Sequence, residues 1–368
     1  MQYTKLKNIN KYKSENINPA KTPDTVFEMY SVPIYETGHP EYLRGSQIAS
    51  NKAVVEKNDI LVCKINPRIN RVWIVSDESD NLNIASSEWI VVRNNEYNPE
   101  FLAWYFRTPR FQKLMTSEVT GIGGSLTRAQ PKSVAEYPVP VLDRNTQNEI
   151  VARLNKCKII IDSKEQELEQ LDTLVKSRFV ELFGDPIKNP KGWEVVKLSE
   201  CLERIDNGKS FTCDSNAREG VFPAILKLSA ATYGDYRPYE NKALLDEKQF
   251  VESVEVHRGD LLFTRKNTPD LVGMAAYVFE TPEKLMMPDL IFRLVTNERM
   301  TPTFLWQLIN NREFRPAIQG ISGGSAKSMS NISKERLKNI EVICPPISEQ
   351  KKLEGVLEQV DKSKFVNI

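Results

Sequence analysis

A long stretch in the middle of the chain combines a seven-residue hydrophobic repeat with dense charge. Residues 145–183 contain no Pro or Gly, and charged side chains fill most positions between the apolar ones. The apolar repeat consists of Leu154, Ile161, Leu168, Val175 and Leu182, with Leu171 in a second, only partly apolar row. This pattern predicts a coiled-coil helix of about 55–60 Å. Gly184 and Pro186 are expected to end it.

A second, shorter amphipathic segment begins near residue 347. Its apolar strip consists of Leu353, Val356, Leu357 and Val360. We expect a helix here that packs against part of the first one, because two apolar seams are stabilised by covering each other. The charged surroundings of the first helix favour a spacer between two domains over a helix that lies on the surface of one domain.

The sequence around the long helix repeats itself. Four landmarks occur twice in the same order, at offsets between 200 and 203 residues. They are 58–61 with 259–262, 99–102 with 302–305, Gly-Gly-Ser at 123–125 with 323–325, and helix starts at Gln147 and Gln350. Solenoid repeats have periods of about 20–50 residues, so this much longer period indicates two copies of a whole domain.

Each copy contains patterns of both strands and helices. The runs 60–63 and 261–264 are short, apolar and rich in strand formers. Helices are expected from 99 and 302, where a polar capping residue precedes Pro. The predicted fold class is α+β, with two repeated mixed domains separated by a long coiled-coil helix. The expected divisions are a first domain at 1–144, the spacer helix at 145–183, a second domain at 184–346 and a short second helix at 347–368.

Composition narrows the class of protein. With 368 residues, of which 40% are hydrophobic and 27% charged, the chain has the composition of a soluble globular protein of two domains. It contains no apolar run long enough for a membrane span and no secretory signal. Its five Cys and two His lack the spacing of a metal site or a disulfide framework. We therefore expect a cytoplasmic protein that binds neither a membrane nor a structural metal.

A net charge of +1 does not predict nucleic-acid binding, so any such site must be local. Residues 107–132 hold five basic side chains against one acidic, and residues 312–338 hold six against two, so both windows carry +4. Both surround a Gly-Gly-Ser sequence, where backbone and cations can approach phosphates. The candidate DNA contacts are Arg110, Gly123, Gly124, Ser125, Arg128 and Lys132 in the first window and Gly323, Gly324, Ser325 and Lys327 in the second. A solvated surface with structural Gly turns is the alternative.

A second pair of candidate segments follows the repeated strands. Arg and Lys can reach guanine in the major groove, and Asn can pair with adenine, so these residue types suit base contacts. The candidates are Lys64, Asn66 and Arg68 after the first strand and Arg265, Lys266 and Asn267 after the second. The alternative is that Lys and Asn are ordinary turn residues here.

The centre and the end of the chain resemble a known family. Residues 177–186, Ser-Arg-Phe-Val-Glu-Leu-Phe-Gly-Asp-Pro, and residues 189–194, Asn-Pro-Lys-Gly-Trp-Glu, are similar to the central signature of type I restriction-modification specificity subunits. The order of a Gly-Gly-Ser loop, Pro345-Pro346 and Glu349-Gln350 opening a helix is also similar. The resemblance covers essentially the whole chain.

The resemblance implies a fold and a set of partners. Two target-recognition domains would each read one half of a split sequence in double-stranded DNA. Two antiparallel helices would separate these domains and bind two methyltransferase subunits. Restriction subunits would join this complex to form the nuclease. S-adenosylmethionine, ATP and Mg²⁺ would be bound by those partners alone. The second helix here is shorter than the family's, which leaves open a shortened subunit that works as a homodimer.

The residues themselves favour a chain without catalysis. No P-loop GxxxxGK[ST] and no Asn/Asp-Pro-Pro-Tyr type tetrapeptide of a methyltransferase occur. The main rival interpretation is a coiled-coil scaffold whose domains bind proteins. The paired basic windows favour DNA, and a steep loss of affinity with salt would distinguish the two. The residue types do not predict which bases are recognised or how far apart two half-sites lie.

Overall fold

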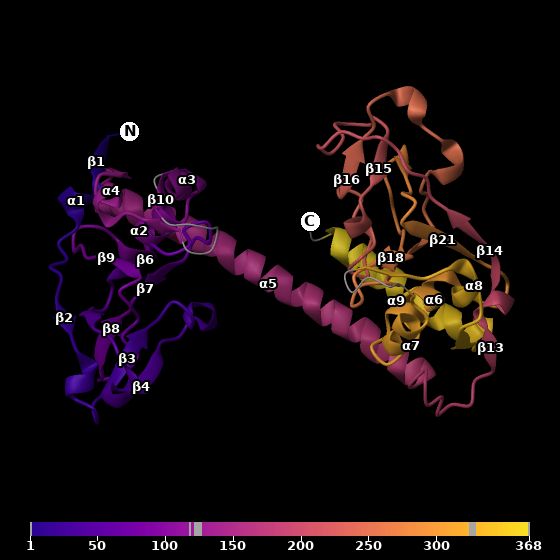
Figure 1. Ribbon diagram of the computed structural model, residues 1–368, viewed down its shortest axis with the longest axis horizontal. Helices are drawn as coiled ribbons and strands as arrows, with labels where there is room; N and C mark the ends of the chain where they lie inside the picture. Colours follow the sequence, from indigo (N-terminus) through magenta and orange to yellow (C-terminus); the bar gives the residue numbers. More distant parts are fainter. Residues whose placement is uncertain (1, 118, 121–126, 324–328, 367–368) are drawn as a thin grey trace. The chain divides into compact units, whose positions relative to one another are not determined.

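The structure is a computed structural model that describes residues 2–117, 119–120, 127–323 and 329–366. It divides into two compact units, Met1–Asp162 and Ser163–Ile368, called unit 1 and unit 2 below. Helix α5 (Arg144–Phe183) is continuous, beginning in unit 1 and ending in unit 2 (Figure 1). The prediction of an unbroken helix over 145–183 is confirmed. The helix is shared by the two units and does not form a unit of its own.

Local geometry explains why α5 ends where it does. Gly184 adopts a left-handed conformation with φ +77°, which glycine reaches without strain. A Cβ at this position would lie only 2.7 Å from Cγ of Pro190. The indole Nε1 of Trp193 donates to the Phe183 carbonyl at 3.0 Å and so satisfies one of the last helical acceptors.

Unit 1 contains two main sheets. The first has the order β2 (Asn16–Ile17), β5 (Lys52–Val54), β8 (Leu82–Ala85), β3 (Val26–Tyr30) and β4 (Glu41–Arg44). The second has the order β7 (Val72–Ile74), β6 (Ile60–Cys63) and β9 (Trp89–Val92). All four residues of β6 are buried, since the strand lies between two others and both of its faces are covered.

Short pairs and helices complete unit 1. Strand β1 (Tyr3–Lys5) pairs with β12 (Pro138–Pro140), and β10 (Val119–Thr120) pairs with β11 (Arg128–Ala129). The helices before α5 are α1 (Leu6–Ile9), α2 (Pro99–Phe106), α3 (Pro109–Ser117) and α4 (Pro131–Val134). Short 3-10 helices are η1 (Pro19–Lys21), η2 (Tyr35–Thr37) and η3 (Gly45–Gln47).

Unit 2 also contains two main sheets. One has the order β14 (Leu202–Asn207), β21 (Ile291–Thr296), β17 (Leu261–Thr264) and β19 (Ala275–Tyr277). The other has the order β16 (Asn241–Ala243), β15 (Ala224–Leu226) and β20 (Leu285–Met286). Two further pairs are β13 (Val195–Lys197) with β23 (Glu341–Ile343) and β18 (Lys266–Asn267) with β22 (Ser330–Asn331).

The helices of unit 2 follow the order seen in unit 1. They are α6 (Pro302–Asn310), α7 (Arg315–Gly320), α8 (Lys334–Lys338) and α9 (Ile347–Val366). Its 3-10 helices are η4 (Leu198–Glu200), η5 (Leu228–Ala230), η6 (Glu247–Gln249) and η7 (Glu252–Val254). As expected from the capping pattern, the Thr301 side chain accepts from the Phe304 amide and the Asn98 side chain accepts from the Glu100 amide.

The two units share one topology, which confirms the repeat. In each, a buried central strand, β6 or β17, lies antiparallel between two neighbours. In the other sheet of each unit, a parallel pair occurs next to an antiparallel one: β3 with β8 and β4, and β15 with β20 and β16. Around this shared arrangement, unit 1 adds β2 and β5 to its five-stranded sheet, and unit 2 adds the six-residue strand β14 at the edge of its four-stranded sheet. The predicted mixed α+β class is confirmed.

A carboxylate that is buried in unit 1 and largely buried in unit 2 directly precedes the central strand. The Asp59 carboxylate accepts from the Glu56 amide at 2.9 Å, and the Asp260 carboxylate accepts from the His257 amide at 2.9 Å. Arg93 bonds Asp59 at 2.6 Å, and Arg293 bonds Asp260 at 2.9 Å. The repeated Asn-Asp and Gly-Asp pairs are therefore turns closed by an internal ion pair.

A buried glutamine near the start of α5 bonds the N-cap residue of α2, and a buried glutamine near the start of α9 bonds the N-cap residue of α6. The Gln147 Oε1 accepts from the Asn98 amide at 2.8 Å, and its Nε2 donates to the Leu142 carbonyl at 2.8 Å. Gln350 does the same with the Thr301 amide at 2.8 Å and the Pro345 carbonyl at 2.7 Å. Both side chains are almost fully buried, so α5 and α9 start at equivalent, fixed places.

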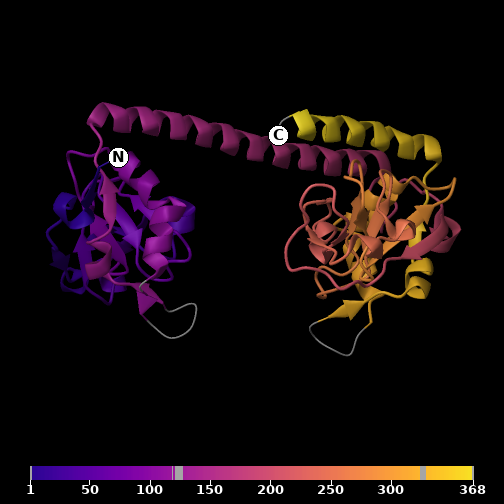
Figure 2. The ribbon, with the colours of Figure 1, turned by 90° about the horizontal axis from the view of Figure 1, so that it is seen from above.

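Helix α9 lies antiparallel beside the C-terminal part of α5 within unit 2 (Figure 2). Leu353, Leu357 and Val360 of α9 share one core with Val175 and other residues near the end of α5. The predicted packing of the two helices is confirmed for this part. The expected apolar seam is closed only here, with Leu171 and Leu182 partly buried beside it. Leu154, Ile161 and Leu168 are exposed to 36%, 56% and 38%.

Candidate nucleic-acid interface

In unit 1, the structure brings together two segments that the sequence singled out separately. The Asn66 amide donates to the Thr127 carbonyl at 2.8 Å, and the Ala129 amide donates to the Lys64 carbonyl at 2.9 Å. Ile65 and Arg128 form an isolated antiparallel bridge. The segment after β6 is therefore bonded to the strand that follows the first Gly-Gly-Ser sequence. Gly123, Gly124 and Ser125 themselves lie outside the described residues.

Unit 2 repeats this arrangement. Strand β18 pairs Lys266 with Asn331 of β22, and the Ile332 amide donates to the Arg265 carbonyl at 2.8 Å. Gly323 and Asn331 exchange two backbone hydrogen bonds of 2.8 Å. The two segments are thus neighbours at the same place in both copies. Gly324, Ser325 and Lys327 lie outside the described residues.

Several cations of the basic window of unit 1 are held by the protein itself. Arg110 lies 4.8 Å from the ring centre of Tyr3 and donates to its hydroxyl at 2.8 Å. Arg128 forms an ion pair with Glu88 at 3.2 Å, which raises the pKa of the guanidinium. A count of charges in the sequence therefore overstates the number of cations free to meet phosphate.

Other candidates of unit 1 are better placed. Arg68 and Lys132 are exposed, and Lys64 is half-buried at the end of the central strand. Within the part of the chain that the structure describes, these three side chains form no ion pair. The Arg68 carbonyl is held by the Gln112 side chain at 2.7 Å, which fixes this turn while leaving the guanidinium outside.

The candidates of unit 2 have different surroundings. Arg265 lies 5.1 Å from the ring centre of Phe292 and bonds the Asn331 side chain at 3.3 Å. Lys266 is half-buried and has no ion-pair partner among the described residues. Asn267 is only 8% exposed, and its Nδ2 donates to the Thr232 hydroxyl at 3.2 Å. The predicted presentation of the Asn267 amide to a base does not fit this placement.

Arg315 counts toward the positive charge of the second window but is used inside the fold. Its guanidinium donates to the carbonyls of Gly273 and Val272, both at 2.7 Å. Burial lowers its pKa. Arg315 and Gln112 both support the loop after the central strand of their unit, so they are positioning residues for the candidate interface.

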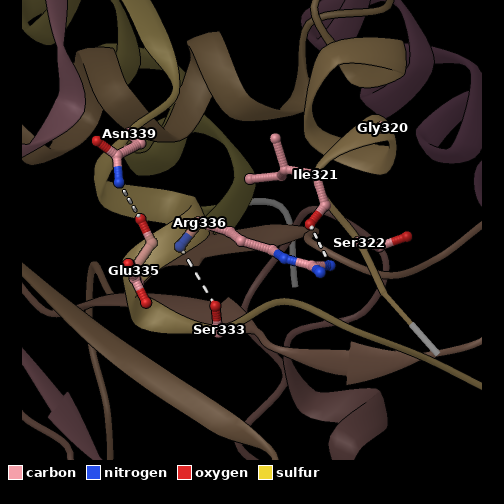
Figure 3. A pocket seen from close by; sticks show the side chains of 7 residues that line it. All are labelled: Gly320, Ile321, Ser322, Ser333, Glu335, Arg336 and Asn339. Carbon is pink, nitrogen blue, oxygen red and sulfur yellow. Dashed lines mark hydrogen bonds between the residues drawn. The ribbon is translucent and has the colours of Figure 1, made fainter.

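Unit 2 has an open depression that is lined by residues just before the second Gly-Gly-Ser sequence and by residues of α8 and its ends (Figure 3). Its lining includes Ser322, Ser333 and Arg336, and the Arg336 Nη1 donates to the Ile321 carbonyl at 3.4 Å. A Cβ on Gly323 would lie 2.2 Å from this Nη1, so the glycine leaves room for the guanidinium. Arg336 has no ion-pair partner among the described residues. Its charge belongs to the second basic window, but neither its residue type nor its spacing gave a reason to single it out.

The described residues meet neither the requirements of a metal site nor those of a membrane-spanning helix. They contain no group of three or more His, Cys, Asp or Glu side chains that could hold a metal ion. They also include no helix with the length and apolar character that crossing a membrane requires. The chemistry available at the two loop clusters is that of cations, amides and exposed backbone.

Comparison with known sequences points to one family. Residues 190–366 match the family model described as type I restriction modification DNA specificity domain. The chain is 30% identical over 180 residues to the specificity subunit of type I restriction enzyme EcoEI of Escherichia coli, which covers 48% of this chain and 30% of that one. It is 21% identical over 366 residues to the specificity subunit of type I restriction enzyme MjaVIII of Methanocaldococcus jannaschii, which covers 93% and 82%. The chain spans 30% and 40% of the length of the first two relatives that it matches.

Solved structures show the same fold. The S subunit of a type I restriction-modification system from M. genitalium matches with a TM-score of 0.58 at 12% identity, covering 100% of this chain and 90% of that one. A chain from a structure on complex assembly and conformational transition of a type I R-M system matches with a TM-score of 0.53 at 19% identity, covering 100% and 92%. At these identities the likeness concerns the fold alone.

Proposed function

We propose that this chain, whose residues 190–366 match the type I restriction modification DNA specificity domain, is a specificity subunit that binds a two-part DNA sequence and directs separate methyltransferase and restriction subunits to it. Each unit would contact one half of the target. The chain would catalyse no step itself, and S-adenosylmethionine, ATP and Mg²⁺ would be bound by the partners.

One observation carries the proposal. In both units, the segment after the buried central strand is hydrogen-bonded to the segment next to the Gly-Gly-Ser sequence. A duplicated fold that presents equivalent loop clusters suits a ligand that itself has two similar parts, such as two stretches of one duplex. The cations of these clusters without an ion-pair partner among the described residues are available for phosphates, namely Lys64, Arg68, Lys132, Lys266 and Arg336.

The N-terminal half of α5 supports the proposed partners. Its exposed apolar side chains include Ile159 at 68%, Ile160 at 52% and Ile161 at 56%. Large apolar side chains that stay exposed along a helix are a feature of protein interfaces. We propose that a methyltransferase subunit covers this part of the helix, and the homodimer stays an alternative occupant.

The proposal is tested with the full chain and its methyltransferase. Methylome sequencing of cells that express both is expected to reveal one two-part motif with modified adenines. A genome methylated without such a motif, or not methylated at all, would contradict the proposal.

Single lysines give a second test. Lys64→Ala and Lys266→Ala should each weaken binding to every duplex about two- to tenfold and lower the log–log salt slope by about 1, because one phosphate contact is lost. Lys188→Ala is the matched control, since this side chain is 83% exposed and lies outside both loop clusters. An unchanged slope in both lysine variants would place the DNA elsewhere.

A further inference from the structure

A loop rich in tyrosine lies against the candidate interface of unit 2. It covers residues 232–239 and connects η5 to β16, and we refer to it as the aromatic loop. Tyr233 and Tyr239 are 55% and 67% exposed. The loop touches the candidate interface through the hydrogen bond from Asn267 to Thr232.

Three anchors hold the aromatic loop in place. At its start, the buried Thr232 hydroxyl accepts from Asn267 and donates to the Leu228 carbonyl at 2.7 Å. The second anchor is Gly234, which has a left-handed conformation with φ +91° and whose carbonyl accepts from the Trp306 indole at 2.8 Å.

The third anchor lies further along the loop. The Tyr236 hydroxyl is 2.7 Å from that of Thr281. With Thr232, Gly234 and Tyr236 bonded to the rest of unit 2, the part of the loop that carries Tyr233 is ordered before any ligand arrives. Such order lowers the entropic cost of binding.

Between the anchors, the exposed Tyr233 side chain is stacked with the partly exposed Arg237 side chain. The Arg237 guanidinium lies 4.6 Å from the ring centre of Tyr233 and also bonds Asp235 at 2.8 Å. Because Asp235 offsets the Arg237 charge, this pair is poorly suited to a phosphate. It offers a flat aromatic surface with a few hydrogen-bonding groups, which suits base edges and thymine methyl groups in a groove.

The corresponding segment of unit 1 offers no such surface among its described residues. After β3, the partly buried Tyr35 packs against the core, with its ring centre 5.7 Å from that of Trp73 and 6.1 Å from that of Trp89. Asn66, the counterpart of Asn267, has φ +47° and uses its backbone amide on Thr127. The aromatic loop is therefore a property of unit 2 and not of the shared fold.

We propose that the aromatic loop contacts DNA and helps to select the half-site read by unit 2, through Tyr233 and Arg237, while Asn267 acts as a positioning residue. This inference rests on the proposed function. It assigns Asn267 an indirect role, because its side chain is buried and bonded to the start of the loop.

The test uses the full chain with its methyltransferase and a pool of duplexes with randomised positions, from which bound molecules are sequenced. The wild type should select a two-part motif. Tyr233→Ala should lose preference at positions of one half only, by about five- to hundredfold, with the other half and the salt slope unchanged. Tyr42→Ala, at a tyrosine of unit 1 that is 48% exposed, is the matched control and should keep both halves.

The positioning role needs its own variants. Asn267→Ala and Thr232→Val should both weaken the same half as Tyr233→Ala, and combining them should add little, because each breaks one shared hydrogen bond. Thr232→Ser keeps the hydroxyl and should restore the wild-type preference. Thermal unfolding of every variant is measured alongside.

The outcomes separate the inference from the function on which it rests. If Tyr233→Ala selects the wild-type motif in both halves, the aromatic loop is not a reading element, although the proposed function stands. Equal loss in both halves for Asn267→Ala would indicate a general structural effect and overturn its positioning role. If the wild type selects no motif, the proposed function fails, and the inference fails with it.

Discussion

Strand β6 of unit 1 and strand β17 of unit 2 occupy the same place in their sheets, yet the segments that follow them differ. The strands share a carboxylate turn, antiparallel neighbours and a bond to the strand beyond the Gly-Gly-Ser sequence. After them, Asn66 forms a turn with φ +47°, whereas Asn267 is buried against Thr232. The comparison separates a shared scaffold from the loops that it carries, and the loops are where two different half-sites would be read.

The largest expected effect concerns the equivalent residues Phe304 and Phe101. Phe304→Ala should cost about 3–5 kcal/mol of unfolding free energy in unit 2, since the ring is fully buried. It also contacts Phe179 and Phe183 of α5, at 5.8 and 4.8 Å between ring centres, so the end of α5 should lose protection in hydrogen exchange. Phe101→Ala should leave that end protected, because Phe101 packs near Tyr97 instead. Equal loss of protection at 175–183 in both variants would contradict this assignment.

The carboxylate turns should differ in strength. Asp59 is 1% exposed and receives two bonds from Arg93, at 2.7 and 2.6 Å, so Asp59→Asn should cost about 3 kcal/mol. The Asp260 side chain is 15% exposed and has one bond from Arg293 at 2.9 Å, and burial raises the pKa of its carboxyl. Asp260→Asn should therefore cost less, about 1–2 kcal/mol. Urea unfolding followed by hydrogen exchange in each unit measures both, and a larger loss for Asp260→Asn would reverse the comparison.

The smallest effect is a dependence on alkaline pH. Burial raises the pKa of Tyr30 in unit 1 and of Tyr236 in unit 2 to about 12 each, from 10.0. In the unfolded chain these phenols lose their protons near pH 10 while the folded chain keeps them, so their contribution to stability is full below about pH 10 and is lost as the pH rises through about 12. Ultraviolet titration of tyrosinate should show late groups at these two positions, and Tyr30→Phe or Tyr236→Phe should each remove one. A titration without late groups would contradict the burial of these phenols.

The sequence was sufficient to predict the features that depend on local pattern. The heptad repeat of 145–183 predicted α5 to within one residue. Both the periodicity of a helix and its end at Gly184 depend on residues that are close together in the sequence. The repeat predicted two copies of one fold because its landmarks are structural. Gln147 and Gln350 are buried anchors, and Asp59 and Asp260 close turns.

The pairing of segments at the candidate interface was less accessible to sequence reasoning. Asn66 bonds Thr127 in unit 1, and Lys266 pairs with Asn331 in unit 2. Several strands and helices separate the two partners of each pair along the chain. Local sequence patterns describe neighbouring residues only, so these pairings become visible only in the folded chain.

The use of each charged side chain also depends on tertiary contacts. Arg110 stacks on Tyr3, and Arg315 donates to loop carbonyls, although both add to the local charge in the sequence. Asn267 has the residue type of a base-reading group, but its burial against Thr232 follows from a contact 35 residues away. Residue type and local charge therefore predicted the region without assigning the individual roles.

The way the aromatic loop is attached has a consequence for how such a protein can evolve or be engineered. The loop lies within the connection between Leu226 and Asn241, the last register partners of two adjacent antiparallel strands, β15 and β16. Replacing only residues 232–239 by a segment of another length keeps both strand ends and the buried Ala230 and Ala231 in place, and doubling the length costs only about 0.6 kcal/mol in closure entropy. New sequence preferences could thus be grafted at this hairpin while the sheet beneath it stays unchanged.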